Sequence, residues 1–365
     1  MMTIQKELER CKKKGLSGVI GTIISTEGST YQKAGAKCFI SEDRKLTGIL
    51  SGGCVESDII EHAMKVIERE KPIILHYDFY GDGDIVWGLG VGCNGKIHIL
   101  LQPYLPAKQP EKAAVIERYV SDSLQKPLHA VIIVKAKDES LRGKMWVIDS
   151  DFNNSGSPIS VHEIAVDYEA RKKNFKNEMV YLGGEQDLYV YYELVSPPPH
   201  LYVFGAGPDA TPLVKMAKNL KWLVTVLDYR PSYCNRNNFP DADNMIVYPS
   251  GSVPNVSLHE NSYVVIMTHN FVHDREILEH ILNSNAAYIG LLGPRKRTDQ
   301  LISTSAALMS NEKVHFLHSP IGLDIGAKTP EEIALSILAE IMMSYRGGSG
   351  KKLSQLSYTE MEKSV

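Results

Sequence analysis

The sequence lacks long apolar segments and an excess of charge of one sign. No uninterrupted apolar run in the 365 residues reaches the roughly 18 residues that a membrane-spanning helix needs. The formal net charge of −3 creates no basic field that would attract nucleic acid or an anionic membrane. The charged N-terminal segment MMTIQKELERCKKKG has no apolar stretch of the kind found in a secretory signal. We therefore expect a cytoplasmic protein with neither nucleic acid nor a membrane as a partner.

Cysteine is scarce, and the common catalytic signatures are absent. The five cysteines are odd in number and scattered, which argues against a secreted disulfide framework and favours reduced thiols. None stands in a CxxC or CxxxH arrangement that would indicate zinc. The sequence also has no Walker A loop, HExxH or GxSxG motif, so nothing in it supports an ATPase, a metalloprotease or a serine hydrolase.

Apolar periodicity divides the chain at a proline-rich linker. Strand patterns and amphipathic helical patterns predict an N-terminal α+β domain over residues 1–105. A β-rich region over residues 106–196 repeats part of that strand order, so we interpret it as a degenerate repeat that completes the N-terminal domain. Ser196–Pro199 then forms a stiff, extended boundary, because consecutive prolines cannot pair inside a sheet.

Strand and helix patterns alternate beyond this linker. The strands are nearly continuous apolar runs such as YVVIM, as expected for a parallel sheet covered by helices on both faces. Residues 197–346 are therefore predicted to form a Rossmann-like, doubly wound α/β domain. One helix is expected over 294–309, and another begins at the capping signal Thr329-Pro-Glu-Glu. Residues 347–365 are expected to form a polar tail.

Two cysteines occupy glycine-rich segments. Gly52 and Gly53 precede Cys54 at the predicted start of a helix, where the helix dipole and exposed amides favour a thiolate. Such a thiolate could be a nucleophile, a persulfide carrier or a soft metal ligand, while a buried structural thiol is the alternative. Cys93 follows the run GLGVG and could line the same pocket, unless this run is only a loop entering a strand. We predict all four residues as cofactor-binding, with Cys54 also catalytic and metal-binding.

A glycine-rich turn opens the predicted Rossmann-like domain. Gly205 and Gly207 follow an apolar strand and precede a helix, and Asp228 ends the next strand. This arrangement is typical of a nucleotide whose phosphate sits at a helix start and whose ribose bonds to the acid. The glycines could instead serve only the turn, and Pro208 and Asp209 would alter the phosphate seat.

Further candidates follow the later strands, where ligands of parallel sheets lie. His269 could be an acid–base group or a hydrogen-bonding partner, and we predict it as catalytic and cofactor-binding. Arg295 and Arg297 begin a helix whose dipole they oppose, which favours a bound anion there. Alternatively, both arginines belong to a run of charged side chains that is simply exposed to solvent.

Long motifs of the chain resemble the XdhC/CoxI family, the xanthine dehydrogenase accessory factors. They run in order from about residue 18 to 341 and are EGSTYQKAGAKCFI, GILSGGCVE, WGLGVGCNGKIHILLQP, PPPHLYVFGAGPDATPL, VTVLDYRP, MTHNFVHD, YIGLLGPRKR and PIGLDIGAKTPEEIALSILAEI. The sequence departs from the usual family pattern at Pro208, where the family has His, and at Pro294, where it has Ser. The second departure removes a backbone donor near the predicted anion.

The resemblance implies an accessory factor of purine catabolism and not a turnover enzyme. It implies binding of molybdenum cofactor of the molybdopterin type, support for exchange of an oxo ligand by sulfido, and insertion into an apo molybdenum hydroxylase such as xanthine dehydrogenase. A cysteine desulfurase is the implied sulfur donor, and a homodimer is the implied assembly. The cysteine motif of the family points to Cys54 first.

The residues leave other functions open. The GAGPDA turn with Asp228 allows an NAD(P)-dependent oxidoreductase, in which His269 would transfer the proton, so the cofactor could be or include a nucleotide or NAD(P). A nucleotidyltransferase would need a magnesium-binding acidic pair, and none is evident. A scaffold between desulfurase and hydroxylase would need neither a thiol nor a pocket.

Overall fold

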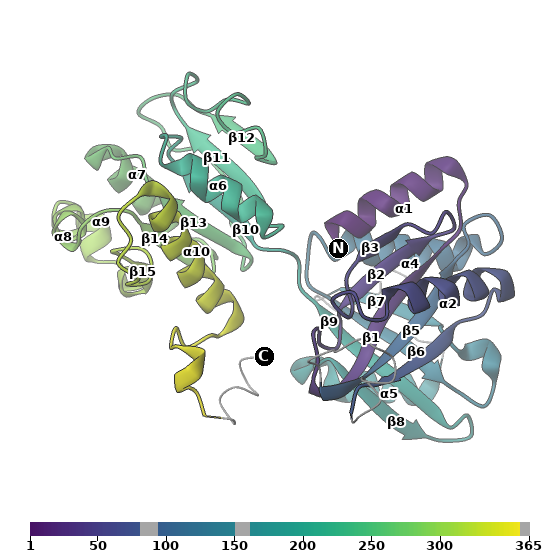
Figure 1. Ribbon diagram of the computed structural model, residues 1–365. Helices are drawn as coiled ribbons and strands as arrows, with labels where there is room; N and C mark the ends of the chain where they lie inside the picture. The colour runs from purple at the N-terminus through teal and green to yellow at the C-terminus, as the bar shows by residue number, and fades with distance from the viewer. Residues whose placement is uncertain (81–93, 150–160, 358–365) are drawn as a thin grey trace. The chain divides into compact units, whose positions relative to one another are not determined.

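Residues 1–80, 94–149 and 161–357 are described by the computed structural model (Figure 1). The chain divides into two units, Met1–Pro197 and Pro198–Val365. Among the described residues, no helix combines the length and the apolar character that crossing a membrane would require.

The first unit contains two antiparallel sheets. Within the described residues, their strand orders are β3-β2-β1-β5-β4 and β7-β6-β9-β8. Ile59 and Ala63 of α2 pack on the first sheet, while Ile164 and Tyr168 of α5 pack on the second. The elements are α1 (Met2–Lys14), β1 (Gly18–Ser29), β2 (Lys37–Ser41), β3 (Leu46–Gly48), α2 (Glu56–Arg69), β4 (Ile73–Asp78), β5 (Asn94–Tyr104), α4 (Pro110–Asp122), β6 (Leu128–Lys135), β7 (Met145–Asp149), α5 (His162–Arg171), β8 (Glu178–Gly183) and β9 (Leu188–Val195).

The two sheets follow the same chain path. In each, a central strand, β1 or β6, pairs antiparallel with the next strand along the chain and with the last strand of its sheet. Each central strand has a register shift directly after its sixth residue, Ile23 or Ile133. The carbonyls of these two residues accept equivalent 2.8 Å hydrogen bonds, from Gly35 N and Gly143 N. A shared path is what an internal repeat would produce, while the predicted domain bounds stay predictions.

A buried ion pair crosses between the sheets. Lys37 Nζ on β2 lies 2.6 Å from Glu193 Oε1 on β9, and the two side chains are only 5% and 3% exposed. The Tyr119 hydroxyl on α4 donates to the second carboxylate oxygen at 2.9 Å, and burial beside this charge raises the pKa of Tyr119 well above its ordinary value. Because a buried charge needs a partner, these contacts specify how the two sheets pack.

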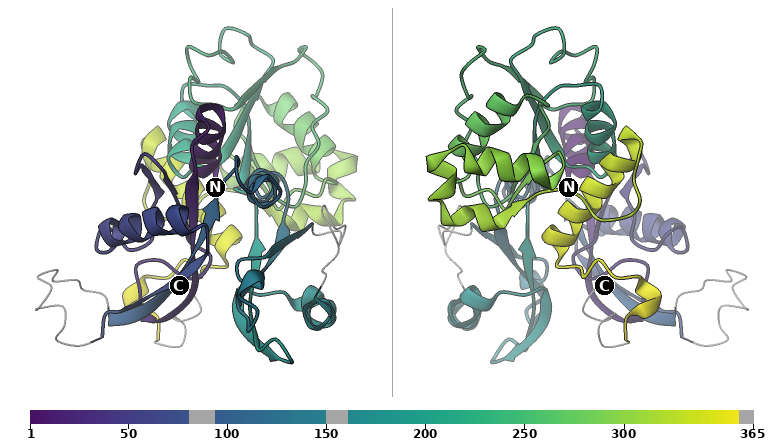
Figure 2. Two further views of the ribbon diagram at one scale, coloured as in Figure 1. Left: turned by 90° about the vertical axis from the view of Figure 1, so that its right-hand side faces the viewer. Right: turned by 90° about the vertical axis from the view of Figure 1, so that its left-hand side faces the viewer.

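The second unit is built on a parallel sheet in the order β12-β11-β10-β13-β14-β15. The chain moves outward from β10 to β12 and then returns past β10 to β13, which is the order of a doubly wound Rossmann fold. Figure 2 shows α10, in yellow, and the green helices α7 to α9 on opposite faces. The elements are β10 (His200–Phe204), α6 (Ala210–Asn219), β11 (Leu223–Asp228), β12 (Asn244–Val247), β13 (Ser262–Ile266), α7 (Phe271–Ile281), β14 (Tyr288–Leu291), α8 (Arg295–Ser303), α9 (Ala306–Met309), β15 (Leu317–His318) and α10 (Pro330–Arg346).

The fold class agrees with the prediction, but some elements differ. The Rossmann-like parallel sheet and the α+β unit before it are confirmed. The single helix expected over 294–309 is wrong, since α8 and α9 are separate helices. The break falls at Ser305, whose hydroxyl accepts from Leu308 N at 3.2 Å and so begins a new helix. Two elements, α5 and β8, were not predicted from the sequence.

Candidate functional site

The loop before α2 presents Cys54. Gly52 and Gly53 have φ values of +75° and +114°, which only glycine adopts at little cost. A Cβ on Gly52 would lie 3.1 Å from the ring of Tyr31. Because α2 begins at Glu56, the half-buried thiol of Cys54 lies just outside the helix and not in its first turn.

Glu56 holds this loop in place. Its carboxylate accepts hydrogen bonds from Ser51 N at 2.9 Å, Gly53 N at 3.0 Å and Val55 N at 3.2 Å, and also from the Ser51 hydroxyl. Burial alone would raise the pKa of Glu56, but these hydrogen bonds lower it. These main-chain amides therefore already donate to the Glu56 carboxylate. Without it, their positive potential would favour the thiolate form of Cys54. Glu56 was not among the predicted site residues, although the Glu two positions after Cys54 in SGGCVE was a signal.

The other described cysteines are buried thiols. Burial raises the pKa of Cys11 to about 11 and that of Cys38 to about 12, and it also raises the pKa of Cys234. Cys93 lies outside the described residues. Cys54 is thus the cysteine with partial exposure in the described part of the chain.

The space beside Cys54 is small. The described residues leave a cavity of about 10 Å³ between Cys54, Tyr31 and Phe79, room for about one water molecule. In residues 1–80, 94–149 and 161–357, no group of three or more His, Cys, Asp or Glu side chains is placed to hold a metal ion. Among the described residues, Cys54 would therefore be a single soft ligand for a metal.

The glycine-rich turn after β10 is closed by groups of the protein itself. Gly205 has φ +116°, and a Cβ there would overlap the Met267 carbonyl oxygen, so only glycine fits. Gly205 N donates to Leu227 O at 2.8 Å, and Ala206 N donates to Asp228 Oδ2 at 2.7 Å. Two amides at the predicted phosphate seat therefore already have acceptors.

Asp228 is almost fully buried and bonded to Arg230. Its Oδ1 accepts from Arg230 N at 2.8 Å and Nε at 2.9 Å, and its Oδ2 accepts from Nη2 at 2.7 Å as well as from Ala206 N. Burial alone would raise the pKa of Asp228, but these bonds lower it. A ribose would have to displace one of them, because a carboxylate has about four acceptor positions. The ribose role of Asp228 stays a prediction.

A cavity of about 640 Å³, called here the His269 cavity, lies beyond the carboxyl ends of β10, β13, β14 and β15. His269 Nε2 lies 2.7 Å from Asp209 Oδ2 within it. His269 has φ +61°, a conformation that is uncommon for residues other than glycine and concentrates at functional sites. The other walls of the cavity are the largely apolar loops 292–294 and 320–327, Arg297, and Ile333 and Ser336 of α10.

Arg297 is held from two sides in this cavity. Its Nη1 donates to the buried Asp274 carboxylate at 2.7 Å, and its guanidinium lies 5.6 Å from the centre of the Phe271 ring. Its Nη2 is buried and has no hydrogen-bond partner among the described residues. An anion at this position would satisfy that donor.

The structure brings together only some of the predicted residues of the second unit. His269 and Arg297 line one cavity, whereas Gly205, Gly207 and Asp228 do not, nor does Arg295. Asp209, the partner of His269, was not predicted as a site residue. The signal for it was an acid directly after the glycine-rich turn.

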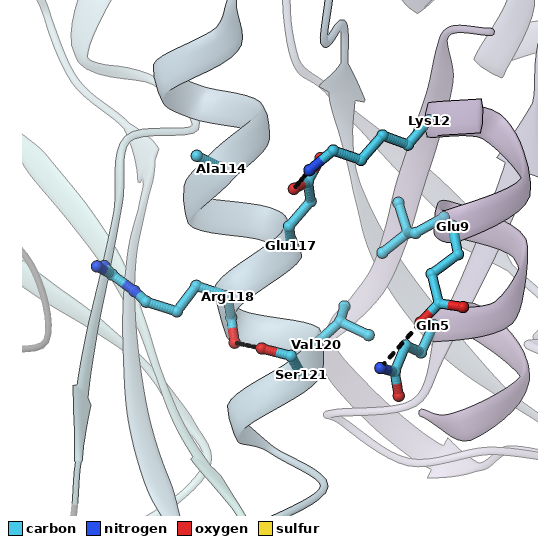
Figure 3. Close-up of a pocket in the computed structure, with 9 residues that line it drawn as sticks. Gln5, Glu9, Lys12, Ala114, Glu117, Arg118, Val120 and Ser121 are labelled. Carbon is cyan, nitrogen blue, oxygen red and sulfur yellow. Dashed lines mark hydrogen bonds and ion pairs between the residues drawn. The ribbon is translucent and has the colours of Figure 1, made fainter. Parts of the chain in front are cut away.

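Figure 3 shows a different hollow, of about 370 Å³, between α1 and α4 of the first unit. Lys12 and Glu117 form a 2.6 Å ion pair across it, and Gln5 donates to Glu9 at 3.2 Å on its wall. None of the predicted site residues lines this hollow. It is therefore not a candidate for the predicted chemistry.

Known proteins resemble the chain over most of its length. A protein of Bacillus subtilis (strain 168), named as a probable xanthine dehydrogenase subunit, is 33% identical over 328 residues, 89% of this chain and 92% of its own length. The uncharacterized protein YqeB of Escherichia coli (strain K12) is 29% identical over 98% of this chain, which is 49% of YqeB. A crystal structure of a protein from Bacillus halodurans, described as a xanthine dehydrogenase, matches with a TM-score of 0.75 and 33% identity over 99% of both chains.

Family models match both units. Residues 201–341 match the XdhC Rossmann domain, and residues 11–78 match the XdhC and CoxI family. The matched segments contain the His269 cavity and the Cys54 loop, respectively. The chain belongs to the XdhC and CoxI family.

Proposed function

We propose that the chain is a maturation factor for a xanthine dehydrogenase or a related molybdenum hydroxylase. In this role it binds molybdenum cofactor, supports its sulfuration and inserts it into the apoenzyme. The observation that carries the proposal is the half-buried Cys54 thiol, presented outside α2 by a loop that Glu56 fixes. Family membership and the names of the two Bacillus relatives support the choice of client.

One residue of the first unit fits the metal of such a cofactor, because Cys54 is a soft sulfur donor suited to molybdenum. When bound, the cofactor supplies the molybdenum and dithiolene chemistry itself. Glu56 orients the thiol, and the Asp209–His269 pair can hold or move a proton at the imidazole.

Cys54 could accept a sulfur atom from a cysteine desulfurase persulfide without any further oxidant or reductant. The Cys54 thiolate attacks the terminal sulfur of a persulfide on a cysteine desulfurase, a new S–S bond forms at Cys54, and the donor cysteine leaves as a thiolate. The space beside Cys54 would have to admit one sulfur atom, so a small movement of the loop accompanies this step.

The test compares wild type with Cys54→Ala. Each protein is incubated anaerobically with molybdenum cofactor, and retained molybdenum and transfer to an apo hydroxylase are measured. We expect wild type to retain and transfer the cofactor and Cys54→Ala to lose both. Cys38→Ala, which removes a fully buried thiol of the same unit, should behave as wild type. No retention by any of the proteins, together with tight NAD(P) binding, would reject the proposal in favour of an oxidoreductase.

A further inference from the structure

The two halves of the parallel sheet differ in the space that they offer to a ligand. A doubly wound sheet can bind one nucleotide half beside its first strands and the other beside its later strands. In the first half, the Asp228 carboxylate is bonded to Arg230 and to Ala206 N. The Arg230 guanidinium also lies 4.3 Å from the centre of the Tyr233 ring. A ribose could reach the Asp228 carboxylate only by displacing one of these hydrogen bonds.

The second half contains an open cavity. The His269 cavity has a volume of about 640 Å³, within the range of roughly 300–1,000 Å³ found for small-molecule sites. Its apolar loop 320–327 and its few polar groups match the general composition of such sites. A single compact ligand therefore has room here without any part of it reaching Asp228.

One cationic side chain, Arg297, lines the cavity, and its Nη1 is already paired with Asp274. The Nη2 of Arg297 is a buried donor without a partner among the described residues, and leaving such a donor unpaired costs stability. Arg297 belongs to the first turn of α8, whose N-cap Pro294 has no side chain that could bond to the helix amides. The start of this helix therefore adds positive potential beside the guanidinium.

A second anionic group would meet repulsion. Asp209 and Asp324 also line the cavity, so a diphosphate bridge extending from Arg297 would face carboxylates. His269, bonded to Asp209 through Nε2 at 2.7 Å, keeps Nδ1 as the ring atom that can bond to a neutral polar group of a ligand.

We propose that the His269 cavity binds a phosphate monoester, with its phosphate on Arg297 at the start of α8 and its organic part against loop 320–327 and His269. The proposal rests on the proposed function, because molybdenum cofactor of the molybdopterin type carries one such phosphate. A nucleoside monophosphate has the same chemistry and is the other source of ligand. Dinucleotides such as NAD are disfavoured, because a ribose beside the first strands would compete with the hydrogen bonds that Asp228 already accepts.

The experiment titrates the full-length protein calorimetrically with inorganic phosphate, guanosine monophosphate and NAD. We expect guanosine monophosphate to bind and NAD to bind at least about tenfold more weakly. Arg297→Lys keeps a cation for Asp274 but removes the second guanidinium arm, so it should weaken guanosine monophosphate binding by about tenfold or more. His269→Gln should weaken it less. Lys296→Ala, which removes an exposed cation of the same helical turn, is the control and should change binding less than about twofold.

Folding of each variant is checked by circular dichroism, since Asp274 is fully buried and needs its partner. If Arg297→Lys does not fold, Arg297→Met with Asp274→Asn removes both charges and serves instead. Absence of binding by inorganic phosphate and guanosine monophosphate, or equal binding by wild type and the Arg297 variant, would overturn the proposal. So would tight NAD binding.

The same proteins separate this proposal from the proposed function. If the cofactor phosphate occupies the cavity, Arg297→Lys loses molybdenum retention in parallel with guanosine monophosphate binding. If it retains molybdenum as wild type does while guanosine monophosphate binding falls, the cavity binds a nucleoside monophosphate and the site stands. Cys54→Ala should bind guanosine monophosphate normally. Failure of molybdenum retention in every protein would therefore reject the proposed function, while the titration with guanosine monophosphate would still decide whether the cavity binds a phosphate monoester.

Discussion

Gly205 is a residue that no side chain can replace at low cost. Its φ of +116° and the overlap of any added Cβ with the Met267 carbonyl oxygen combine backbone strain with a clash. We expect Gly205→Ala to lower the free energy of unfolding by about 2–5 kcal/mol, measured by urea denaturation. Gly251 has φ +77° with nothing within 4 Å of an added Cβ, so Gly251→Ala should lose only about 1 kcal/mol. Equal losses would show that the clash at Gly205 relaxes.

Glu56 sets both the stability and the reactivity of the Cys54 loop. Glu56→Gln replaces one acceptor oxygen by a donor that faces the amides of Ser51, Gly53 or Val55. We expect a loss of about 1–3 kcal/mol in the free energy of unfolding. Because the loop is then less restrained, alkylation of the half-buried Cys54 should be faster, measured with iodoacetamide and mass spectrometry.

The control for Glu56 lies on the same helix. Glu68 is an exposed carboxylate of α2, so Glu68→Gln removes the same charge without touching the loop. It should change neither stability nor alkylation appreciably. Unchanged alkylation of Cys54 in Glu56→Gln would show that Glu56 does not restrain the thiol.

Single residues were predictable where backbone conformation decided them. Gly205 stands in a predicted glycine-rich turn, and its φ is positive, a conformation that glycine adopts at little cost. The hydrogen-bond donors to the acidic side chains were not predictable, because they depend on which main-chain amides the folded chain brings close to each carboxylate. Glu56 and Asp228 both accept from main-chain amides, and pattern alone gave no reason to choose these partners over a ligand.

His200, the first residue of β10, is expected to make the second unit sensitive to pH. Burial lowers the pKa of this imidazole to about 4, and its Nε2 lies 2.8 Å from Thr225 Oγ1 on β11. The unfolded chain binds a proton on His200 below its ordinary pKa of about 6.5. Stability is therefore complete above about pH 6.5 and falls as pH falls toward about 4, since only the unfolded chain is protonated in this window.

The size of this effect can be measured by urea denaturation across that window. A shift of this size corresponds to at most about 3 kcal/mol, and partial exposure of the ring reduces it. We expect His200→Gln, which cannot be protonated, to flatten the dependence on pH. His162→Gln, at an exposed position of α5, should leave it as in wild type. An unchanged slope in His200→Gln would assign the pH dependence to other groups.

Elements were predictable where apolar periodicity was long. The buried strands β10, β11 and β13 are apolar along most of their length, which is why the parallel sheet could be predicted. β8 has no buried residue and one exposed residue, Tyr181, so its alternation was too weak to detect. The break between α8 and α9 comes from the single side chain of Ser305, and such local hydrogen bonds compete with helix continuation without altering apolar spacing.

At the scale of the whole molecule, each unit has its own hydrophobic core. Among the described residues, the apolar clusters of the first unit draw on residues from Met1 to Val195, and those of the second draw on residues from Leu201 to Tyr345. The sequence predicts a domain boundary at Ser196–Pro199, which interrupts both kinds of periodicity, and the predicted bounds stay predictions. It could not identify the buried ion pair of Lys37 with Glu193, since these residues lie on different strands far apart in the chain.

Separate cores predict that the units fold independently. We expect residues 1–197 and residues 198–365, expressed separately, each to unfold cooperatively in urea. Trp222 is the single tryptophan of the second fragment and is buried, so its fluorescence reports that unit alone. In the full chain, Trp222→Phe leaves the tryptophan signal to the first unit, which allows each transition to be assigned.

Independent folding would also decide where a phosphate monoester binds. The residues that line the His269 cavity all belong to the second unit, so a folded fragment 198–365 should bind guanosine monophosphate with the affinity of the full chain. A folded fragment that fails to bind it would mean that residues of the first unit complete the site. A fragment that shows no cooperative transition would show that its core needs the first unit, in spite of its separate set of apolar contacts.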